Sequence, residues 1–206
     1  MIPRFGDRRR TRVGLLGGSF NPAHAGHRHI SEVALKRLAL DEVWWLVSPQ
    51  NPLKASAGMA PLPERLASAR AAARHPGIRV TDIEKALGTR YTVDTLAALR
   101  RRFPAARFVW LMGADNLAQL PRWRGWTRIV RTVPIAILAR TPYSVTALTG
   151  KAARRFPGAR IPARAASGLA DMIPPAWVFL HIRPHPASAT QLRARRRAKG
   201  GPTGGA

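Results

Sequence analysis

Short apolar runs alternate along this chain with longer segments whose apolar residues recur at helical spacing. Apolar runs of this length, bounded by turn residues, are typical of strands in a parallel sheet that is covered on both faces. We expect strands over residues 13–16, 43–47, 78–83, 107–112, 134–139 and 176–182.

The segments between these runs predict helices. Ile30, Val33, Ala34 and Leu38 share one face of a helix that should begin near residues 24–27. Such regular alternation predicts an α/β fold with a doubly wound parallel sheet, right-handed crossovers and helices on both faces. Ligands of such sheets bind outside the carboxyl ends of the strands. Further helices are expected over residues 63–75, 92–99, 116–120 and 145–156.

The chain of 206 residues is long enough for one domain with a sizeable core. It contains no internal repeat and no interior linker that would divide it. We expect a basic flexible lead-in over residues 1–12 and one domain over 13–197, with a short helical portion at its C-terminal end. The glycine-rich residues 198–206 should form a flexible tail.

The charge balance is strongly basic. There are 35 Lys and Arg residues, of which 30 are Arg, against 10 Asp and Glu, and the net charge is +25. This field attracts phosphate-bearing partners and favours non-specific binding to polyanions at low salt. The arginines are scattered, however, without interleaved aromatic residues or a recognisable groove-reading helix. We therefore expect no specific nucleic-acid partner, and codon bias in a GC-rich genome accounts for the arginine excess.

The absence of cysteine excludes a thiol nucleophile, a disulfide and an iron–sulfur cluster. No apolar run reaches the roughly 18 residues of a membrane span. The basic start of the chain also lacks the apolar middle of a secretory signal. We expect a cytoplasmic protein with no membrane partner, and a homo-oligomer is left open.

The stretch VGLLGGSFNPAHAGHRH, residues 13–29, carries the clearest chemical signal. Gly17 and Gly18 can take positive φ and let a ligand lie against the backbone, although an ordinary turn at the end of a strand also explains them. His24 and His27 fall at the expected helix start, where unpaired N–H groups and the helix dipole attract phosphate. A zinc site would need ligands from distant segments. Phosphate binding is therefore favoured, and we expect no metal ligand here.

Candidate ligand-binding residues also follow other expected strands. Lys54 lies in a proline-broken loop after the second strand, and Arg140 directly follows the fifth. Gly113 and Asp115 follow the fourth strand, where an aspartate can accept a ribose hydroxyl or an adenine amino group. Capping of the next helix is the structural alternative for Asp115.

Two further segments have both a structural and a functional explanation. Thr92 is placed to cap a helix, and Trp123, which lies between two arginines, suits either the core or stacking on a heteroaromatic ring. Near the C-terminus, Ser188, Thr190 and Arg193 bring hydroxyls and a guanidinium group to a helix start. They would form a second phosphate site if the fold brings them beside the histidines.

Several of these motifs resemble the nucleotidyltransferase superfamily that carries an HxGH element. GGSFNPAHAGH is similar to GGTFDPxHxGH, SPQNPLK to xPxxNPxK, and SATQLR to SSTxIR. DIEKALGTRYTVDTL is similar to DxExxRxGxSYTxDTL, and LMGADNLAQLPRWRGW to GxDxLxxxxxWxxW. The YTVDTL and WRGW stretches set the chain apart from pantetheine-phosphate and cytidylyl relatives, so it resembles the bacterial nicotinate-nucleotide adenylyltransferases. It departs from the pattern at Asn21, which replaces Asp, and at Arg90, which replaces Ser.

The resemblance implies a Rossmann-like nucleotidyltransferase fold and adenylyl transfer from ATP to nicotinate mononucleotide in NAD biosynthesis. The 5′-phosphate of the mononucleotide would attack the α-phosphorus of ATP in line, releasing pyrophosphate, and Mg²⁺ would arrive with ATP. Catalytic roles at the phosphates are implied for His24, His27 and Arg193. Substrate-binding roles are implied for Gly17, Gly18, Ser19, Phe20, Lys54, Thr92, Gly113, Asp115, Trp123, Arg140, Ser188 and Thr190.

Other functions stay open at this point. The acceptor could be nicotinamide mononucleotide or phosphopantetheine. A basic nucleic-acid-binding protein would account for the charge and would show salt-dependent DNA binding without turnover of ATP. A fragment of a class I aminoacyl-tRNA synthetase would share the histidine element. It should also carry a KMSKS-like loop and a tRNA-binding domain, and the sequence shows neither.

Overall fold

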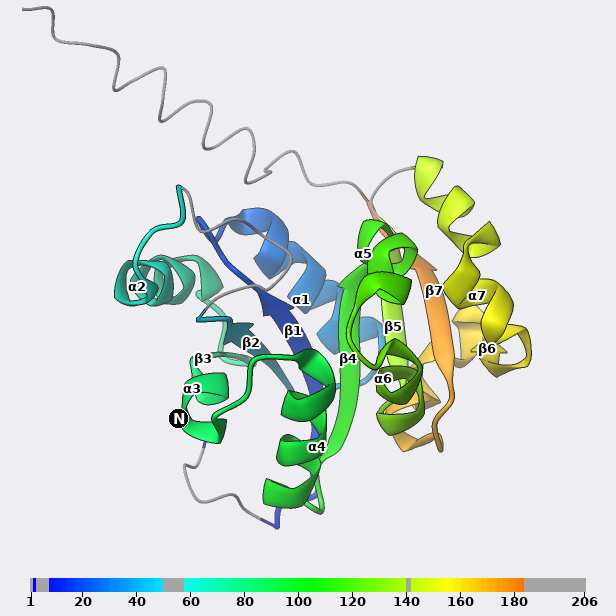
Figure 1. Cartoon of the computed structure of the whole chain (residues 1–206), viewed down its shortest axis with the longest axis horizontal. Helices are drawn as coiled ribbons and strands as arrows, with labels where there is room; N and C mark the ends of the chain where they lie inside the picture. The colour runs from blue at the N-terminus through cyan, green and yellow to red at the C-terminus, as the bar shows by residue number, and fades with distance from the viewer. Residues whose placement is uncertain (1, 3–7, 50–57, 140–141, 184–206) are drawn as a thin grey trace, which may run out of the picture.

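The computed structural model describes residues 2, 8–49, 58–139 and 142–183. Its centre is a parallel sheet of seven strands in the order β3-β2-β1-β4-β5-β7-β6 (Figure 1). All six neighbouring strand pairs are parallel. The strands are β1 (Arg12–Gly18), β2 (Glu42–Val47), β3 (Ile78–Thr81), β4 (Arg107–Gly113), β5 (Ile135–Ala139), β6 (Arg160–Ile161) and β7 (Trp177–His181).

Helical segments connect the strands. The α-helices are α1 (Ala25–Arg37), α2 (Leu62–Ala73), α3 (Ile83–Leu87), α4 (Thr92–Arg102), α5 (Ala114–Gln119), α6 (Trp126–Thr132) and α7 (Lys151–Arg155). The 3-10 segments are η1 (Leu120–Arg122), η2 (Pro142–Thr149), η3 (Pro157–Ala159) and η4 (Ala163–Asp171).

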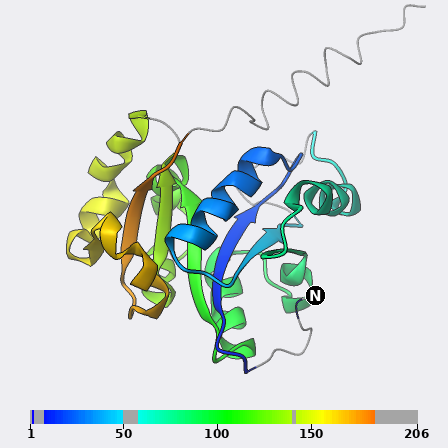
Figure 2. The ribbon, with the colours of Figure 1, turned by 180° about the vertical axis from the view of Figure 1, so that it is seen from behind.

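The helices cover both faces of the sheet. Figure 1 shows α4, α5 and α6 in front of the strands, and Figure 2 shows α1 across the opposite face. The order of strands on either side of β1 explains this arrangement, because the chain winds outward through β2 and β3 and then returns to begin β4. Crossovers in opposite directions place their helices on opposite faces. The expected α/β, doubly wound, Rossmann-like fold is therefore confirmed.

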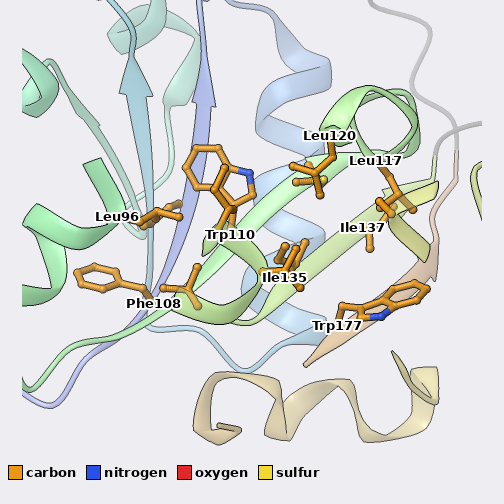
Figure 3. Packing of buried hydrophobic residues seen from close by; sticks show 14 of the residues in the cluster. Leu96, Phe108, Trp110, Leu117, Leu120, Ile135, Ile137 and Trp177 are labelled. Carbon is orange, nitrogen blue, oxygen red and sulfur yellow. The ribbon is translucent and has the colours of Figure 1, made fainter. Parts of the chain in front are cut away.

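Each face of the sheet has its own apolar core, and alternate residues of each strand belong to different cores. In β4, Phe108, Trp110 and Met112 pack on the face of α4 to α6, whereas Val109 and Leu111 pack on the face of α1 and α2. Figure 3 shows the first core, with Trp110 and Phe108 beside residues of the neighbouring strands and helices. The apolar runs of the sequence are continuous because both faces are buried.

The structure corrects several expected boundaries. The strand expected over 78–83 ends at Thr81, and α3 begins at Ile83, since the Thr81 hydroxyl accepts the N–H of Ile83 and ends the extended segment. The helix expected over 145–156 is replaced by η2 and the short α7. Strand β6 has only two residues, too few for a hydrophobic pattern to reveal. Within the described ranges, no helix has both the length and the apolar character needed to cross a membrane.

Candidate active site

The candidate site lies where β1 and β4 end. The strand order reverses direction at this pair, and ligands of doubly wound sheets bind at such a point. A cavity of about 370 Å³ opens there. Its lining residues are Gly17, Gly18, Ser19, Ser48, Glu84, Arg90, Tyr91, Thr92, Trp110, Asn116, Gln119, Arg122, Trp123 and Arg124.

His24 and His27 cap the start of α1 reciprocally. Nδ1 of His24 accepts the backbone N–H of Gly26 at 3.1 Å, and Nδ1 of His27 accepts the backbone N–H of His24 at 3.3 Å. A ring nitrogen that accepts a hydrogen bond turns its lone pair toward the donor, so the Nδ1 atoms of both rings face the backbone of the helix start. The spacing of the two histidines therefore lets both rings cap the helix start through Nδ1.

Aromatic side chains hold the two imidazoles together. The ring centroids of His24 and His27 are 3.9 Å apart, and Phe20 lies 4.8 Å from His27. Phe20 is itself stacked on the buried Trp45, and the Trp45 indole donates to the hydroxyl of Ser31 at 2.8 Å. Phe20 is absent from the cavity lining. Its expected substrate contact stays a prediction, whereas its packing supports the histidine pair.

The glycines serve a purpose that differs from the expected one. Gly17 and Gly18 lie in β1, and neither is among the residues with positive φ. A Cβ at Gly17 would stand 2.6 Å from Cη2 of Trp110, far inside van der Waals contact. Gly17 is therefore needed for the close approach of an indole ring. The expectation of positive φ was wrong because both residues continue the sheet to its edge.

Tyr91, Thr92, Trp110 and Trp123 form another part of the lining of the cavity. The indoles of Trp110 and Trp123 meet edge to face, with centroids 6.3 Å apart. Trp123 is half-buried and lines the cavity, so it is not a fully buried core residue. Its stacking on a ligand ring stays a prediction. The expectation that Thr92 caps α4 was wrong, since Tyr91 is the N-cap residue and no side chain caps this helix.

Gly113 ends β4 and is the N-cap residue of α5, and Asp115 is an exposed residue in the first turn of that helix. The N-cap residue of α5 is Gly113 and not Asp115, so the expectation that Asp115 is the cap of this helix was wrong. Neither residue lines the cavity, although Asn116 does. Their adenosine-binding role stays a prediction. Sequence patterns point to the end of a strand, but the exact residue that faces the cavity depends on the turn.

The cavity has a cationic rim and one buried carboxyl. Arg90, Arg122 and Arg124 are exposed around it, and Arg124 lies over the ring of Tyr91 at 4.7 Å. Glu84 is 7% exposed, and burial raises the pKa of its carboxyl, while hydrogen bonds from the hydroxyls of Ser48 and Thr95 act in the opposite direction. Within the described part of the chain, Oε2 of Glu84 has no hydrogen-bond partner.

Several predicted site residues lie outside the described residues. Of the predicted residues that are described, Gly17, Gly18, Ser19, Thr92 and Trp123 line the cavity together. His24 and His27 are not among the lining residues and lie at the start of α1, the helix after β1. Other lining residues were not predicted from the sequence, because their chemistry resembles that of ordinary core or surface positions: Ser48, Glu84, Trp110, Asn116 and Gln119. The predicted residues without a described position are Lys54, Arg140, Ser188, Thr190 and Arg193.

Comparison with known proteins identifies the family. The model of the cytidylyltransferase-like family matches residues 15–195. A protein of Cereibacter sphaeroides is 59% identical over 185 residues, covering 88% of this chain and 96% of its own length. A protein of Caulobacter sp. strain K31 is 56% identical over 184 residues, covering 89% and 97%. Both relatives are named as nicotinate-nucleotide adenylyltransferases.

The fold has a solved counterpart. The Plasmodium falciparum nicotinic acid mononucleotide adenylyltransferase complexed with NaAD superimposes with a TM-score of 0.64, covering 89% of this chain and 83% of that chain. The two are 14% identical in sequence, so this match establishes the shared fold. The identity of 56–59% to the bacterial relatives over most of both chains leads to one conclusion: the chain belongs to the nicotinate-nucleotide adenylyltransferase family.

Proposed function

We propose that the protein joins ATP and nicotinate mononucleotide to form deamido-NAD and pyrophosphate. The observation that carries the proposal is the reciprocally capped histidine pair at the start of α1, the helix that follows the cavity-lining residues Gly17, Gly18 and Ser19 in the chain. A helix start that combines the positive end of the helix dipole with two imidazole groups is suited to a polyphosphate. The names of the bacterial relatives specify the nucleotide and the acceptor.

The reaction needs no nucleophile from the protein. An oxygen of the mononucleotide 5′-phosphate forms a bond to the α-phosphorus of ATP, and the bond from that phosphorus to the bridging oxygen of the β-phosphate breaks. Negative charge moves onto the departing pyrophosphate. Nε2–H groups of His24 and His27 would donate hydrogen bonds to the phosphate oxygens around the reacting phosphorus. Catalysis would then consist of alignment and charge stabilisation.

The mononucleotide fits the cavity beside Trp110 and Trp123. Its volume of about 370 Å³ lies in the range of small-molecule sites. The half-buried indole of Trp123 can stack on a pyridine ring, and the start of α4 at Thr92 offers backbone N–H groups to a carboxylate. The cationic rim of Arg90, Arg122 and Arg124 favours a substrate with a phosphate and a carboxylate over a neutral amide.

The remaining assignments follow from the family resemblance. Lys54 would bind the phosphate of the mononucleotide, and Gly113 and Asp115 would bind the adenosine. Phe20 and Arg140 would complete the substrate site. Ser188, Thr190 and Arg193 would bind the departing pyrophosphate, with Arg193 as the third catalytic group.

Magnesium would accompany ATP. Among the described residues, no three His, Asp or Glu side chains gather into a metal site. These residues thus offer no protein cage, and we propose that Mg²⁺ is held by the ATP phosphates and water. The rate should follow the concentration of the Mg·ATP complex.

The test measures pyrophosphate release with ATP and nicotinate mononucleotide, nicotinamide mononucleotide or phosphopantetheine in turn. Nicotinate mononucleotide should give the highest kcat/KM. His27→Ala should lower turnover by about two to four orders of magnitude, since it removes a donor at the reacting phosphates. His29→Ala is the matched control, because His29 lies on the same helix and bonds the carbonyl oxygen of Arg183. Absence of turnover with every acceptor would refute the proposal.

A further inference from the structure

Arg65 is a buried arginine beneath the candidate site. It lies in the first turns of α2 and is 2% exposed, and its hydrogen bonds within the described part of the chain all go to backbone carbonyl oxygens. Nη1 donates to Ser19 at 2.8 Å and to Ser48 at 2.7 Å, and Nη2 donates to Pro49 at 2.8 Å. Nε donates to Ala60 at 2.9 Å, so one guanidinium group joins three segments of backbone.

A buried guanidinium group is costly. Burial lowers the pKa of Arg65, because the charged form loses its hydration. No carboxylate is among its hydrogen-bond partners in the described residues. The group nevertheless stays protonated, because an arginine pKa lies far above neutrality. An apolar residue would fill the space without the cost of desolvating a charge. We therefore expect the charged, forked guanidinium group to do more than fill space.

Two of the four carbonyls that Arg65 binds belong to residues that line the cavity. Ser19 follows β1 and Ser48 follows β2, and both residues line the cavity. One nitrogen, Nη1, binds both carbonyls and therefore sets their separation. The peptide that joins Ser19 to Phe20 is trans, so holding the carbonyl oxygen at Arg65 turns the N–H of Phe20 to the opposite side.

Asn21 also connects the segment after β1 to the residues that precede α2. Its amide donates to the carbonyl oxygen of Gly58 at 3.0 Å and accepts the N–H of Ala60 at 3.3 Å. Ala60 therefore contacts both Asn21 and Arg65. An aspartate at position 21 would lack the amide donor, which gives this departure from the family pattern a structural reason.

We propose that Arg65 is a positioning residue for adenylyl transfer, which fixes the Ser19 and Ser48 walls of the site relative to each other. This inference rests on the proposed function. Arg65 acts through the backbone and does not touch the substrate. Because it sets alignment, its loss should lower kcat more than it raises either KM.

The chain offers a matched control on the same helix. Arg70 also lies in α2 but is exposed to solvent. Arg70→Lys and Arg70→Ala therefore make the same substitutions at an arginine of this helix that does not contact the site. Lysine at position 65 keeps the charge but has one donor nitrogen, which cannot span carbonyls that the guanidinium reaches with three. Alanine leaves a space that a free guanidinium ion can enter.

The experiment compares wild type with Arg65→Lys, Arg65→Ala and the two Arg70 variants. We would measure kcat, both KM values and the melting temperature, with assays run well below each melting temperature. We expect kcat of Arg65→Lys to fall about tenfold to a hundredfold with smaller changes in KM, and the Arg70 variants to match wild type. Millimolar guanidinium chloride should raise kcat of Arg65→Ala several-fold and leave wild type and Arg70→Ala unchanged.

The outcomes separate this inference from the proposed function. No turnover by wild type would contradict the proposed function itself. Normal turnover by wild type together with a near-normal kcat in Arg65→Lys would overturn the positioning role. The positioning role would also be overturned if the fall in kcat of either Arg65 variant were proportional to its loss of folded protein and guanidinium did not restore it. If Arg65→Ala does not fold, the kcat and KM values of Arg65→Lys decide alone.

Discussion

Replacing Gly17 by Ala tests how tightly β1 and β4 define the site. The added Cβ would lie 2.6 Å from Cη2 and 3.2 Å from Cζ2 of Trp110. Atoms of the rigid indole ring must therefore move by several tenths of an ångström. Trp110 is 3% exposed and its edge meets Trp123, so the displacement reaches a second residue of the cavity.

The expected loss of stability can be worked from this geometry. Adding a methyl group to a closely packed interior costs about 1–3 kcal/mol. For a domain of about 150–250 residues, 1 kcal/mol corresponds to roughly 2–4 °C in melting temperature. Gly17→Ala should therefore melt about 2–12 °C below wild type. Because Trp123 moves with Trp110, KM for nicotinate mononucleotide should also rise more than KM for ATP.

Gly18→Ala is the control. It adds the same methyl group one residue later, on the opposite face of β1, where the nearest atom is Cε2 of Phe20 at 3.4 Å. This is ordinary van der Waals contact, so Gly18→Ala should melt within about 2 °C of wild type, as a substitution without a clash does. The same comparison by thermal denaturation controls for the change in backbone freedom that Gly→Ala brings at both positions.

A second substitution, at Trp110, tests whether the indole ring is the cause of the expected loss of stability in Gly17→Ala. Trp110→Phe removes the two ring atoms that meet the new methyl group, so it should offset the cost of Gly17→Ala. In a double-mutant cycle the pair should be more stable than the sum of the single changes by about 1–3 kcal/mol. Equal melting temperatures for Gly17→Ala and Gly18→Ala, or additive effects in the cycle, would refute the argument that Gly17 accommodates the indole.

Three further predictions follow from buried polar groups and from the cavity. Burial raises the pKa of Glu84 above its unfolded value, so the stability it contributes at acidic pH is lost as the pH rises through the folded pKa. The melting temperature of Glu84→Gln minus that of wild type should therefore increase from pH 4 to pH 8, and a constant difference would contradict this. Ser31→Ala leaves the buried N–H of Trp45 without its acceptor and should cost about 1–3 kcal/mol in urea denaturation, whereas an effect near zero would show that water replaces the hydroxyl. Trp123→Ala should raise KM for nicotinate mononucleotide far more than KM for ATP, and equal increases would exclude stacking on the pyridine ring.

The histidine pair shows how far the sequence could predict the site. Two histidines three residues apart at a helix start indicated phosphate binding, and their placement at the N-terminus of α1 is confirmed. That both rings cap the helix through Nδ1 could not be predicted, because the choice between Nδ1 and Nε2 depends on side-chain rotamers. Phe20, which packs against His27, and Trp45, on which Phe20 is stacked, are ordinary apolar residues in the sequence.

Arg65 and Glu84 show why the rest of the site could not be predicted. Both lie in segments rich in charged residues, where an arginine or a glutamate is usually solvated. Their burial depends on which face of α2 meets the ends of β1 and β2, and on how α3 turns after Thr81. Periodicity predicts that a helix exists, but its contacts with distant segments decide which charged side chain is enclosed.

The sequence by itself determined the layers of this protein, because continuous apolar runs and helical periodicity leave few alternatives to a parallel sheet covered on both faces. It also determined the family, since five motifs with this spacing occur in the known adenylyltransferases. Only the tertiary structure decided that Gly17 admits the indole of Trp110, that Arg65 joins the ends of β1 and β2, and that Glu84 is buried. Each of these depends on contacts between residues far apart in the chain, and local preferences carry no information about such contacts.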